Sequence, residues 1–290
     1  MLGYKQRIKN SFSKAASTYD QYASVQKEVA VRLIDSTGPH LFQNILEIGC
    51  GTGNYTKMLQ ERFPSADITA IDFSADMISV AARKLNKKKR FRLFVDDAEE
   101  FIPETGKKYD LITSNSTFQW FTDLKKGLEH YNELLTNRGM IIFSMMGPET
   151  FYELYEIMND LYPGKVNMAA QYFMQHDDVE SLLRTVFKSV KISETVLTRR
   201  HESILELLKT IKYTGVNIKR NGGKILFTPA HLKKAENAYI KRFGAIKTSC
   251  QVFLCAASHV ERPLKNVQFC SSTKKAKIST GGIYIEHFED

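Results

Sequence analysis

The sequence predicts an α/β fold with a seven-stranded, mostly parallel sheet and helices on both of its faces. Short apolar runs alternate with helical segments between residues 44 and 145, which is typical of repeated βα units. A glycine-rich turn follows the first apolar run, where doubly wound sheets bind nucleotides or nucleosides. The links between the segments are short, which favours neighbouring parallel strands. These observations predict a Rossmann-like domain.

Individual elements follow from apolar runs and from turn residues that interrupt them. The expected strands are 44–48, 67–72, 91–95, 109–115, 140–145, 189–197 and 251–256. The expected helices between them are 55–63, 75–85, 124–135, 149–162, 179–187, 204–214 and 231–243. Apolar residues at helical spacing also predict helices ahead of the first strand.

The pattern divides the chain into three parts. Residues 1–40 are predicted to form a helical lid. Residues 41–257 are predicted to form the α/β domain, with helical insertions around 149–187 and 202–245 that would build a cap. Residues 258–290 show no clear pattern of strands or helices, so we expect a loosely attached tail and assign it no role.

Composition narrows the class of protein. Of the 290 residues, 43% are hydrophobic and 25% are charged, which is ordinary for a globular protein. No apolar run has the length of a signal peptide or a membrane span, so a cytoplasmic protein is expected. The four cysteines form no CxxC pair and no zinc spacing with histidines, so we expect reduced thiols and no metal. The net charge of +9 attracts polyanions without naming one: nucleic acid, an anionic membrane or an acidic carrier protein.

The turn after the first strand has the pattern E-x-G-x-G-x-G, formed by Glu47, Gly49, Gly51 and Gly53. Glycines let the backbone approach a ligand closely, and the helix that follows offers free N–H groups. A dinucleotide fingerprint starting at Gly49 would require another glycine where the chain has Asn54. The turn instead resembles the first motif of class I methyltransferases, which bind the methionine part of S-adenosylmethionine there. A tight structural turn is the alternative.

Acidic residues end the next two predicted strands. Asp72 ends the second strand and is expected to accept hydrogen bonds from both ribose hydroxyls, although it is also suited to cap the next helix, as is Ser74. The segment after the third strand resembles the adenine-contacting motif of the same superfamily. There Asp97 would accept from the exocyclic amine, and Asp96 competes for this role.

The resemblance to class I methyltransferases implies further contacts with the cofactor. They are Phe73, Met77, Ala98 and Asn115. Asn115 opens the segment 115–121 (NSTFQWF), which lies beside the sulfonium in that superfamily. Four motifs in this order assign S-adenosyl-L-methionine as the cofactor, with S-adenosyl-L-homocysteine as its product.

Several segments narrow the resemblance further. They are 12–23 (FSKAASTYDQYA), 115–121, 143–154 (FSMMGPETFYEL), 208–217 (LKTIKYTGVN) and 251–254 (QVFL). Over about residues 5–257 the chain resembles the malonyl-acyl-carrier-protein O-methyltransferases of biotin synthesis. The resemblance implies methyl transfer to the free carboxylate of a malonyl thioester. This step masks the carboxylate as a methyl ester and opens pimeloyl-chain synthesis. The implied partner is acyl carrier protein carrying malonyl, or malonyl-coenzyme A, with neither nucleic acid nor membrane involved.

The implied reaction needs no general base, because a carboxylate is already ionised at neutral pH. Enclosure and positioning would then supply much of the acceleration. Tyr19 and Tyr22 of the lid are expected over the cofactor and substrate, and Trp120 as a wall of the site; simple packing is the alternative for all three. Arg199 or Arg200, placed after the sixth strand, would bind the malonyl carboxylate, or else lie solvated on the surface. The resemblance favours Arg199.

Other interpretations stay open at this point. One is a methyltransferase for another small carboxylic acid or a quinone precursor. A second is an RNA or protein methyltransferase, which the absence of an N-P-P-Y motif at 115–118 disfavours. A third is a fold that binds cofactor without turnover. The basic runs 87–90, 233–234 and 274–275 are either a docking face for an acidic carrier or solvated surface.

Overall fold

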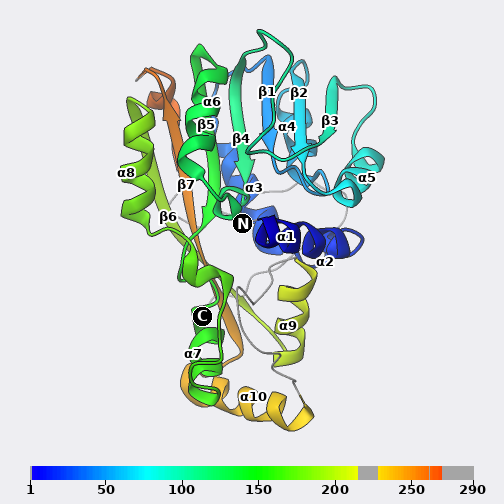
Figure 1. Ribbon diagram of the computed structural model, residues 1–290, viewed down its shortest axis with the longest axis vertical. Helices are drawn as coiled ribbons and strands as arrows, with labels where there is room; N and C mark the ends of the chain where they lie inside the picture. Colours follow the sequence, from blue (N-terminus) through cyan, green and yellow to red (C-terminus); the bar gives the residue numbers. More distant parts are fainter. Residues whose placement is uncertain (1, 215–227, 261, 270–290) are drawn as a thin grey trace.

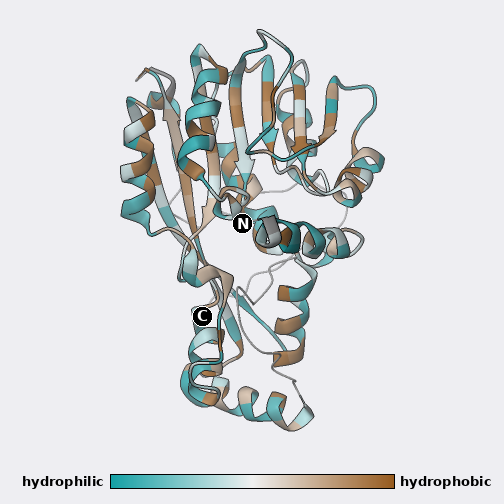
Figure 2. Cartoon of the chain, in the orientation of Figure 1, coloured by the Kyte–Doolittle hydropathy of each residue, from teal (hydrophilic) through white to brown (hydrophobic). Residues whose placement is uncertain are grey.

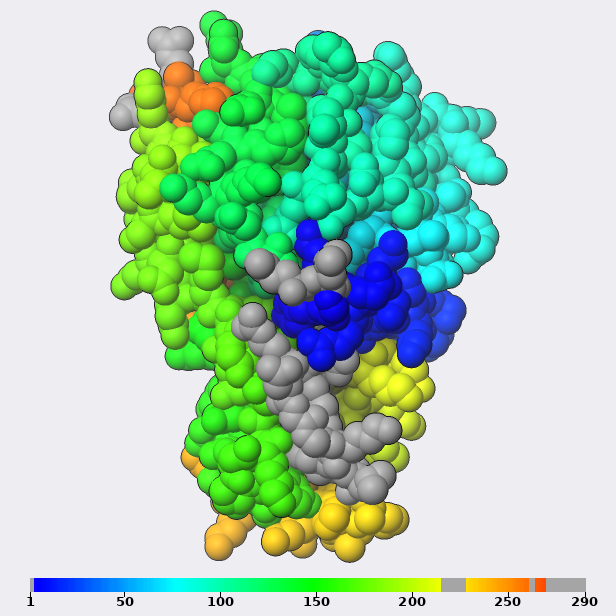
Figure 3. Space-filling view, in the orientation of Figure 1, coloured from blue at the N-terminus to red at the C-terminus, as the bar shows by residue number. Residues whose placement is uncertain are grey.

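The computed structural model describes residues 2–214, 228–260 and 262–269 of the chain. Figure 1 shows an α/β part at the top and a smaller lobe below it, with two long strands running through both. Helices α1 (Leu2–Ala15) and α2 (Tyr19–Tyr22) lie between the two parts. In the space-filling view, this N-terminal segment (blue) lies between the α/β part and α9 (yellow) (Figure 3).

One sheet contains all seven strands in the order β3-β2-β1-β4-β5-β7-β6. The strands are β1 (Asn44–Ile48), β2 (Asp67–Asp72), β3 (Phe91–Val95), β4 (Tyr109–Asn115), β5 (Leu135–Met146), β6 (Ser189–Arg200) and β7 (Lys247–Ser258). Strands β1 to β5 pair in parallel, and β7 is antiparallel to both of its neighbours. The predicted seven-stranded, mostly parallel sheet is therefore confirmed. The strand order reverses between β1 and β4, so a ligand crevice is expected at their carboxyl ends.

Helices cover both faces of this sheet, as predicted. Leu33 of α3 (Ser24–Ser36) packs in one buried cluster with Ile45 of β1, and α4 (Asn54–Arg62) contributes to the same cluster. The next residue of β1, Leu46, joins a second cluster with α6 (Leu124–Leu134) and α8 (His176–Val186). Neighbouring strand residues point to opposite faces, so these clusters lie on opposite sides. Figure 2 shows hydrophobic residues on the strands and hydrophilic ones over much of α6 and α8.

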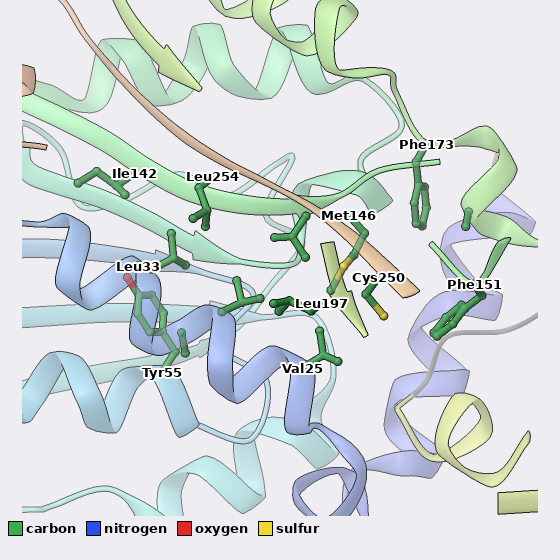
Figure 4. Packing of buried hydrophobic residues seen from close by; sticks show 14 of the residues in the cluster. Val25, Leu33, Tyr55, Ile142, Met146, Phe151, Phe173, Leu197, Cys250 and Leu254 are labelled. Carbon is green, nitrogen blue, oxygen red and sulfur yellow. The ribbon is translucent and has the colours of Figure 1, made fainter. Parts of the chain in front are cut away.

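The lower lobe continues the core of the α/β part. It contains α7 (Tyr152–Leu161), α9 (Ile204–Tyr213), α10 (Pro229–Phe243) and the lower ends of β6 and β7. Figure 4 shows Met146, Phe151, Leu197 and Cys250 in the cluster that extends across the junction. The two parts are therefore joined by packing as well as by the chain. The remaining elements are α5 (Ala75–Lys84), η1 (Phe118–Trp120), η2 (Ala169–Tyr172) and η3 (Arg262–Asn266).

Two expectations from the sequence are wrong. Strand β6 extends to Arg200, paired with Lys247 of β7, so Arg199 and Arg200 lie within the strand and not after it. The sequence did not predict this extension, because the polar end of β6 has little preference for a strand by itself and is held in one by its pairing with β7. The chain after residue 257 is not loosely attached over its described part, since Leu264 and Val267 are almost fully buried. Residues 270–290 lie outside the described residues.

Two further observations concern the described residues alone. None of their helices is long and apolar enough to cross a membrane. The three described cysteines, Cys50, Cys250 and Cys255, are free and buried. Burial raises the pKa of each thiol, so these cysteines are packed as protonated side chains. Cys270 lies outside the described part of the chain.

Candidate active site

The glycine-rich turn follows β1, and its three glycines serve different purposes. All three have positive φ: 69° at Gly49, 53° at Gly51 and 78° at Gly53. A Cβ on Gly49 would come within 2.1 Å of the Thr117 hydroxyl, and one on Gly53 within 3.0 Å of Ala81. A Cβ on Gly51 would meet no atom within 4 Å. Packing therefore requires two of the glycines, whereas the third borders open space beside the turn.

Glu47 lies in β1 just before the turn, and its carboxyl is buried. The residue is 1% exposed, and its Oε2 atom has no hydrogen-bond partner. Burial raises the pKa of Glu47 to about 8, and nearby Asp72 adds to this increase. The nearby Thr56 side chain opposes this increase, but a buried carboxyl oxygen without a partner is costly unless a cation or donor satisfies it. The α-ammonium group of S-adenosylmethionine has the chemistry that Glu47 lacks, so the site fits this cofactor.

Asp72 ends β2 and faces the same turn. Its Oδ2 accepts from the Gly51 amide at 2.9 Å, and its Oδ1 accepts from the Ser74 amide at 2.8 Å. Burial raises the pKa of Asp72 to about 6, against the lowering effect of these two amides and of Lys9. Ser74 caps helix α5, since its hydroxyl accepts from the Met77 amide. Asp72 keeps lone pairs for further donors, and its role as ribose acceptor stays a prediction.

The third motif, after β3, is covered by the N-terminal helix. Lys5 of α1 places its ammonium 2.5 Å from both Asp97 Oδ2 and Glu99 Oε2. The backbone carbonyl of Ala98 accepts from the Tyr131 hydroxyl. Asp96 is exposed and accepts from the Asp97 amide. Asp97 thus already holds a cation from α1, and its proposed contact with adenine stays a prediction.

Asp20 of α2 fastens the same N-terminal segment to the glycine turn. Its Oδ1 accepts from Thr52 Oγ1 at 2.6 Å and from Asn54 Nδ2 at 2.8 Å. Its Oδ2 accepts from the Lys84 ammonium at 2.6 Å. These bonds outweigh burial and hold the pKa of Asp20 below its usual value. A further hydroxyl pair, Ser13 with Ser74 at 2.8 Å, joins α1 to the loop after β2.

These contacts show residues that sequence reasoning missed. Lys5, Ser13 and Asp20 bind the loops after β3, β2 and β1, respectively. Asp20 is next to Tyr19 in the segment 12–23, which the sequence analysis singled out, so Asp20 could have been predicted as a site residue. Lys5 carries no such signal, because it is one of several basic residues in α1 and its partner is 92 positions away.

Aromatic side chains from four segments meet around Phe12, and one of them, Phe73, lies in the loop after β2. The Phe12 ring of α1 lies 6.4 Å from Tyr19, 6.4 Å from Phe73 and 6.0 Å from Trp120, measured between centroids. Burial, with Asp72 and Asp20 nearby, raises the pKa of Tyr19 above its usual value, so its hydroxyl stays protonated. The structure therefore brings three of the predicted site residues together, and Phe12 is the member that the prediction omitted.

Tyr22 faces the lower lobe. Its ring stacks on Tyr213 of α9, with 4.9 Å between centroids and 29° between planes. Trp120 also reaches toward this side, in an edge contact with Phe173 at 5.3 Å. Tyr22 and Tyr19 thus point toward different partners, one to the lower lobe and one to the cofactor motifs.

Asn115 is held by hydrogen bonds, and Met77 is held by burial. Asn115 donates from Nδ2 to the Gln26 carbonyl of α3 at 2.9 Å and accepts from Ser144 Oγ at 3.0 Å. The next residue, Ser116, has φ of 60°, an uncommon conformation for a residue with a side chain. Met77 is 1% exposed within α5. The backbone therefore turns sharply at the end of β4, where a ligand crevice is expected.

Arg199 contacts α3 through Glu28. Its Nη2 atom is 2.5 Å from Glu28 Oε2, and its Nη1 donates to the Thr198 carbonyl at 3.0 Å. Arg200 is exposed and, as the next residue of the strand, points to the other face. The two arginines are thus separated by the strand, and Arg199 alone of the two faces α3.

The sheet order, the glycine-rich turn and the acidic residues near the ends of β1 and β2 define a class I S-adenosylmethionine-dependent methyltransferase. Residues 46–141 match the family model of a methyltransferase domain. Two solved structures share the fold. The YcgJ protein of Bacillus subtilis has a TM-score of 0.57 and 14% sequence identity, over 81% of this chain and 99% of that chain. Phosphoethanolamine N-methyltransferase 2 of Haemonchus contortus has a TM-score of 0.51 and 17% sequence identity, over 79% of this chain and 52% of that chain.

Curated relatives narrow this class. Malonyl-[acyl-carrier protein] O-methyltransferase 1 of Ilyobacter polytropus is 36% identical over 245 residues, which are 83% of this chain and 88% of that protein. The enzyme of the same name from Bacillus anthracis is 36% identical over 220 residues, 73% of this chain and 80% of that protein. The chain belongs to the malonyl-[acyl-carrier protein] O-methyltransferase family, and its cofactor is S-adenosylmethionine.

Proposed function

We propose that this protein transfers a methyl group from S-adenosylmethionine to the free carboxylate of a malonyl group carried on acyl carrier protein, the opening step of pimeloyl-chain synthesis for biotin. The observation that carries the proposal is the extent of the similarity. The family model for the methyltransferase domain matches residues 46–141, whereas the relative from Ilyobacter polytropus aligns over 245 residues. The similarity therefore takes in much of the chain outside that domain, where the acceptor is expected to bind.

When bound, S-adenosylmethionine supplies an activated methyl group on a positively charged sulfur. The acceptor carboxylate needs no deprotonation, since its usual pKa is about 4. Its oxygen forms the new bond to the methyl carbon as the carbon–sulfur bond breaks, and the bonding pair stays on sulfur. The products are a neutral ester and a neutral thioether, so no proton has to move.

The protein's own residues then bind, orient and exclude water. Glu47 and Asp72 offer acidic groups at the turn, and a cationic ligand beside them would favour their ionised forms. Phe12, Tyr19 and Trp120 cover this place with rings, which keep water out and present faces that attract a sulfonium. Opposite charges attract more strongly when water is excluded, so this enclosure favours bringing the carboxylate and the sulfonium together.

Arg199 is our choice for the group that binds the malonyl carboxylate. Leu197, two positions earlier on the same face of β6, is buried in the cluster that also contains Val25 of α3. Arg199 therefore projects from this face toward α3, whereas Arg200 projects to the other. A guanidinium pairs with a carboxylate through two parallel hydrogen bonds, which a lysine cannot form. Tyr22 and Tyr213 would close the lower side of the acceptor.

Mass spectrometry of malonyl-acyl carrier protein incubated with this protein and S-adenosylmethionine tests the proposal. We expect one methyl group to be added to the malonyl carrier, and none to the acetyl carrier, which has no free carboxylate. Malonyl-coenzyme A under the same conditions shows whether the carrier protein itself is required. Cofactor binding without methylation of either malonyl thioester would refute the proposed acceptor and favour another small carboxylic acid.

A further inference from the structure

We propose that Glu28 is a positioning residue that competes with the acceptor's carboxylate for Arg199, and so sets how tightly the protein binds an anionic acceptor. The proposal rests on the proposed function, because it takes Arg199 as the acceptor's partner. It concerns three side chains, Arg199, Glu28 and Arg32, which we call the Arg–Glu–Arg triad.

The triad is a single carboxylate held between two guanidinium groups. Glu28 Oε2 lies 2.5 Å from Arg199 Nη2, and Glu28 Oε1 lies 2.8 Å from Arg32 Nη2. The second terminal nitrogen of Arg199 donates to the Thr198 carbonyl at 3.0 Å. Two positive charges and one negative charge leave the triad with a net charge of +1. It therefore attracts one more anion while one carboxylate is already in place.

The triad lies close to the end of the sheet where the cofactor motifs meet. Glu28 stands two residues after Gln26, whose carbonyl accepts from Asn115 at the end of β4. Val25, one turn earlier on α3, packs in the same cluster as Leu197 of β6 (Figure 4). Arg199 is therefore fixed at the junction of α3, the cofactor motifs and the lower lobe, where an acceptor would have to lie.

The ion pair between Arg199 and Glu28 is weak enough for another carboxylate to replace Glu28. The side chains of Arg199 and Glu28 are 31% and 34% exposed, so water screens their attraction. Burial tends to raise the pKa of Glu28, but the bonds to Arg199 and Arg32 outweigh it and lower the pKa below its usual value. Glu28 is therefore ionised at neutral pH and competes with any carboxylate that approaches Arg199.

The competition has a consequence for turnover. A malonyl carboxylate that binds Arg199 weakens or displaces the bond to Glu28, which keeps Arg32 as a partner. Methylation turns the acceptor into a neutral ester, which no longer attracts the guanidinium. Arg199 then returns to Glu28, so the product complex holds no unpaired arginine. Glu28 thus lowers the affinity for the substrate and leaves the affinity for the product unchanged.

The test is Glu28→Gln, which keeps the shape of the side chain and removes its charge. We expect the KM for malonyl-acyl carrier protein to fall by about three- to tenfold, with kcat and the Kd for S-adenosylmethionine changed by less than about twofold. Glu180→Gln is the matched control, because Glu180 pairs with Arg184 at 2.6 Å on α8, a helix that packs mainly against α6 and β6. A KM for Glu28→Gln that is unchanged or raised would overturn the proposal.

A second variant and a double mutant distinguish the proposed competition from an effect of misfolding. Glu28→Asp keeps the charge on α3 but moves it away from Arg199, because the side chain is shorter. The KM should therefore fall as well, by a smaller factor than in Glu28→Gln. In the background of Arg199→Ala, the substitution Glu28→Gln should leave KM unchanged, because Glu28 acts through Arg199. An equal fall in KM with and without Arg199 would show a general electrostatic effect and contradict the proposal.

Binding of malonate ion, measured by calorimetry with S-adenosylhomocysteine present, separates this inference from the proposed function. Glu28→Gln should bind malonate about three- to tenfold more tightly than the unchanged protein, whether or not malonyl carrier is methylated. Tighter malonate binding without methylation would refute the proposed function alone. Normal methylation with unchanged malonate binding and unchanged KM would refute the role of Glu28 alone.

Discussion

The cofactor region and the proposed acceptor region around Arg199 are held together by different forces. In the cofactor region, Asp72 accepts hydrogen bonds from backbone amides in the loops that follow β1 and β2, and Glu47 is almost fully buried. In the acceptor region, Arg199 and Glu28 are side chains 171 positions apart and about one-third exposed. Buried backbone contacts are rigid and shielded from water, whereas partly exposed ion pairs exchange partners at low cost. These contacts favour a rigid cofactor site and an adjustable site for the proposed acceptor.

The largest effect is expected from Gly51→Arg. A side chain there would enter the open space beside the turn, at a φ of 53° that disfavours residues with a Cβ. We expect the calorimetric affinity for S-adenosylmethionine to fall by about a hundredfold or more. Gly106→Arg is the matched control, since Gly106 also has positive φ and open space but lies in an exposed loop. Unchanged cofactor affinity in Gly51→Arg would place the cofactor elsewhere.

The acceptor region is tested by Arg199→Ala. Losing a charge-assisted pair of about 2 kcal/mol should raise the KM for malonyl-acyl carrier protein about thirtyfold. The Kd for S-adenosylmethionine should stay within about twofold, because the cofactor region does not depend on Arg199. Arg200→Ala, on the other face of β6, should change neither value. Equal losses in both values would mean that the two regions are not separable.

The contacts of Asp20 join the lid to the cofactor region, so Asp20→Asn tests whether the lid retains the cofactor. The variant loses the charge that binds Lys84, and its amide nitrogen can no longer accept. S-adenosylhomocysteine should dissociate about tenfold faster in stopped-flow measurements. Asp160→Asn, which alters an exposed pair with Arg242 in the lower lobe, is the control. An unaltered dissociation rate would show that the lid does not control release.

The smallest effect concerns Glu47 and pH. Its pKa of about 8 in the folded protein exceeds its usual value, so between about pH 6.5 and 8 the folded state binds more protons than the unfolded state. The free energy of unfolding without cofactor should therefore fall as pH rises through this window. We expect Tm to fall by about 2–4 °C more than in Glu47→Gln, whose amide does not titrate. Parallel pH profiles of the two proteins would contradict the raised pKa.

Sequence patterns predicted the parts of the site that depend on local order. Each cofactor motif follows a strand, and parallel strands end at the same edge of a sheet, so Gly51, Asp72, Asp97 and Asn115 were predictable as neighbours. Their individual contacts with the cofactor stay predictions. The aromatic cluster was only partly predictable: Tyr19 and Trp120 were singled out, but no periodicity shows that Phe12 brings them together.

The class of fold, the cofactor and the family could be predicted from the sequence, because short apolar runs, glycine spacing and short motifs depend on local order. Tertiary structure alone decided that Lys5, Asp20 and Glu28 bind the loops and strands of the α/β part, and that β6 extends through Arg199. Charged side chains have many possible partners and no periodic signature. Their partners are selected only when packing brings distant segments together, which is why the acceptor region had to be seen in three dimensions.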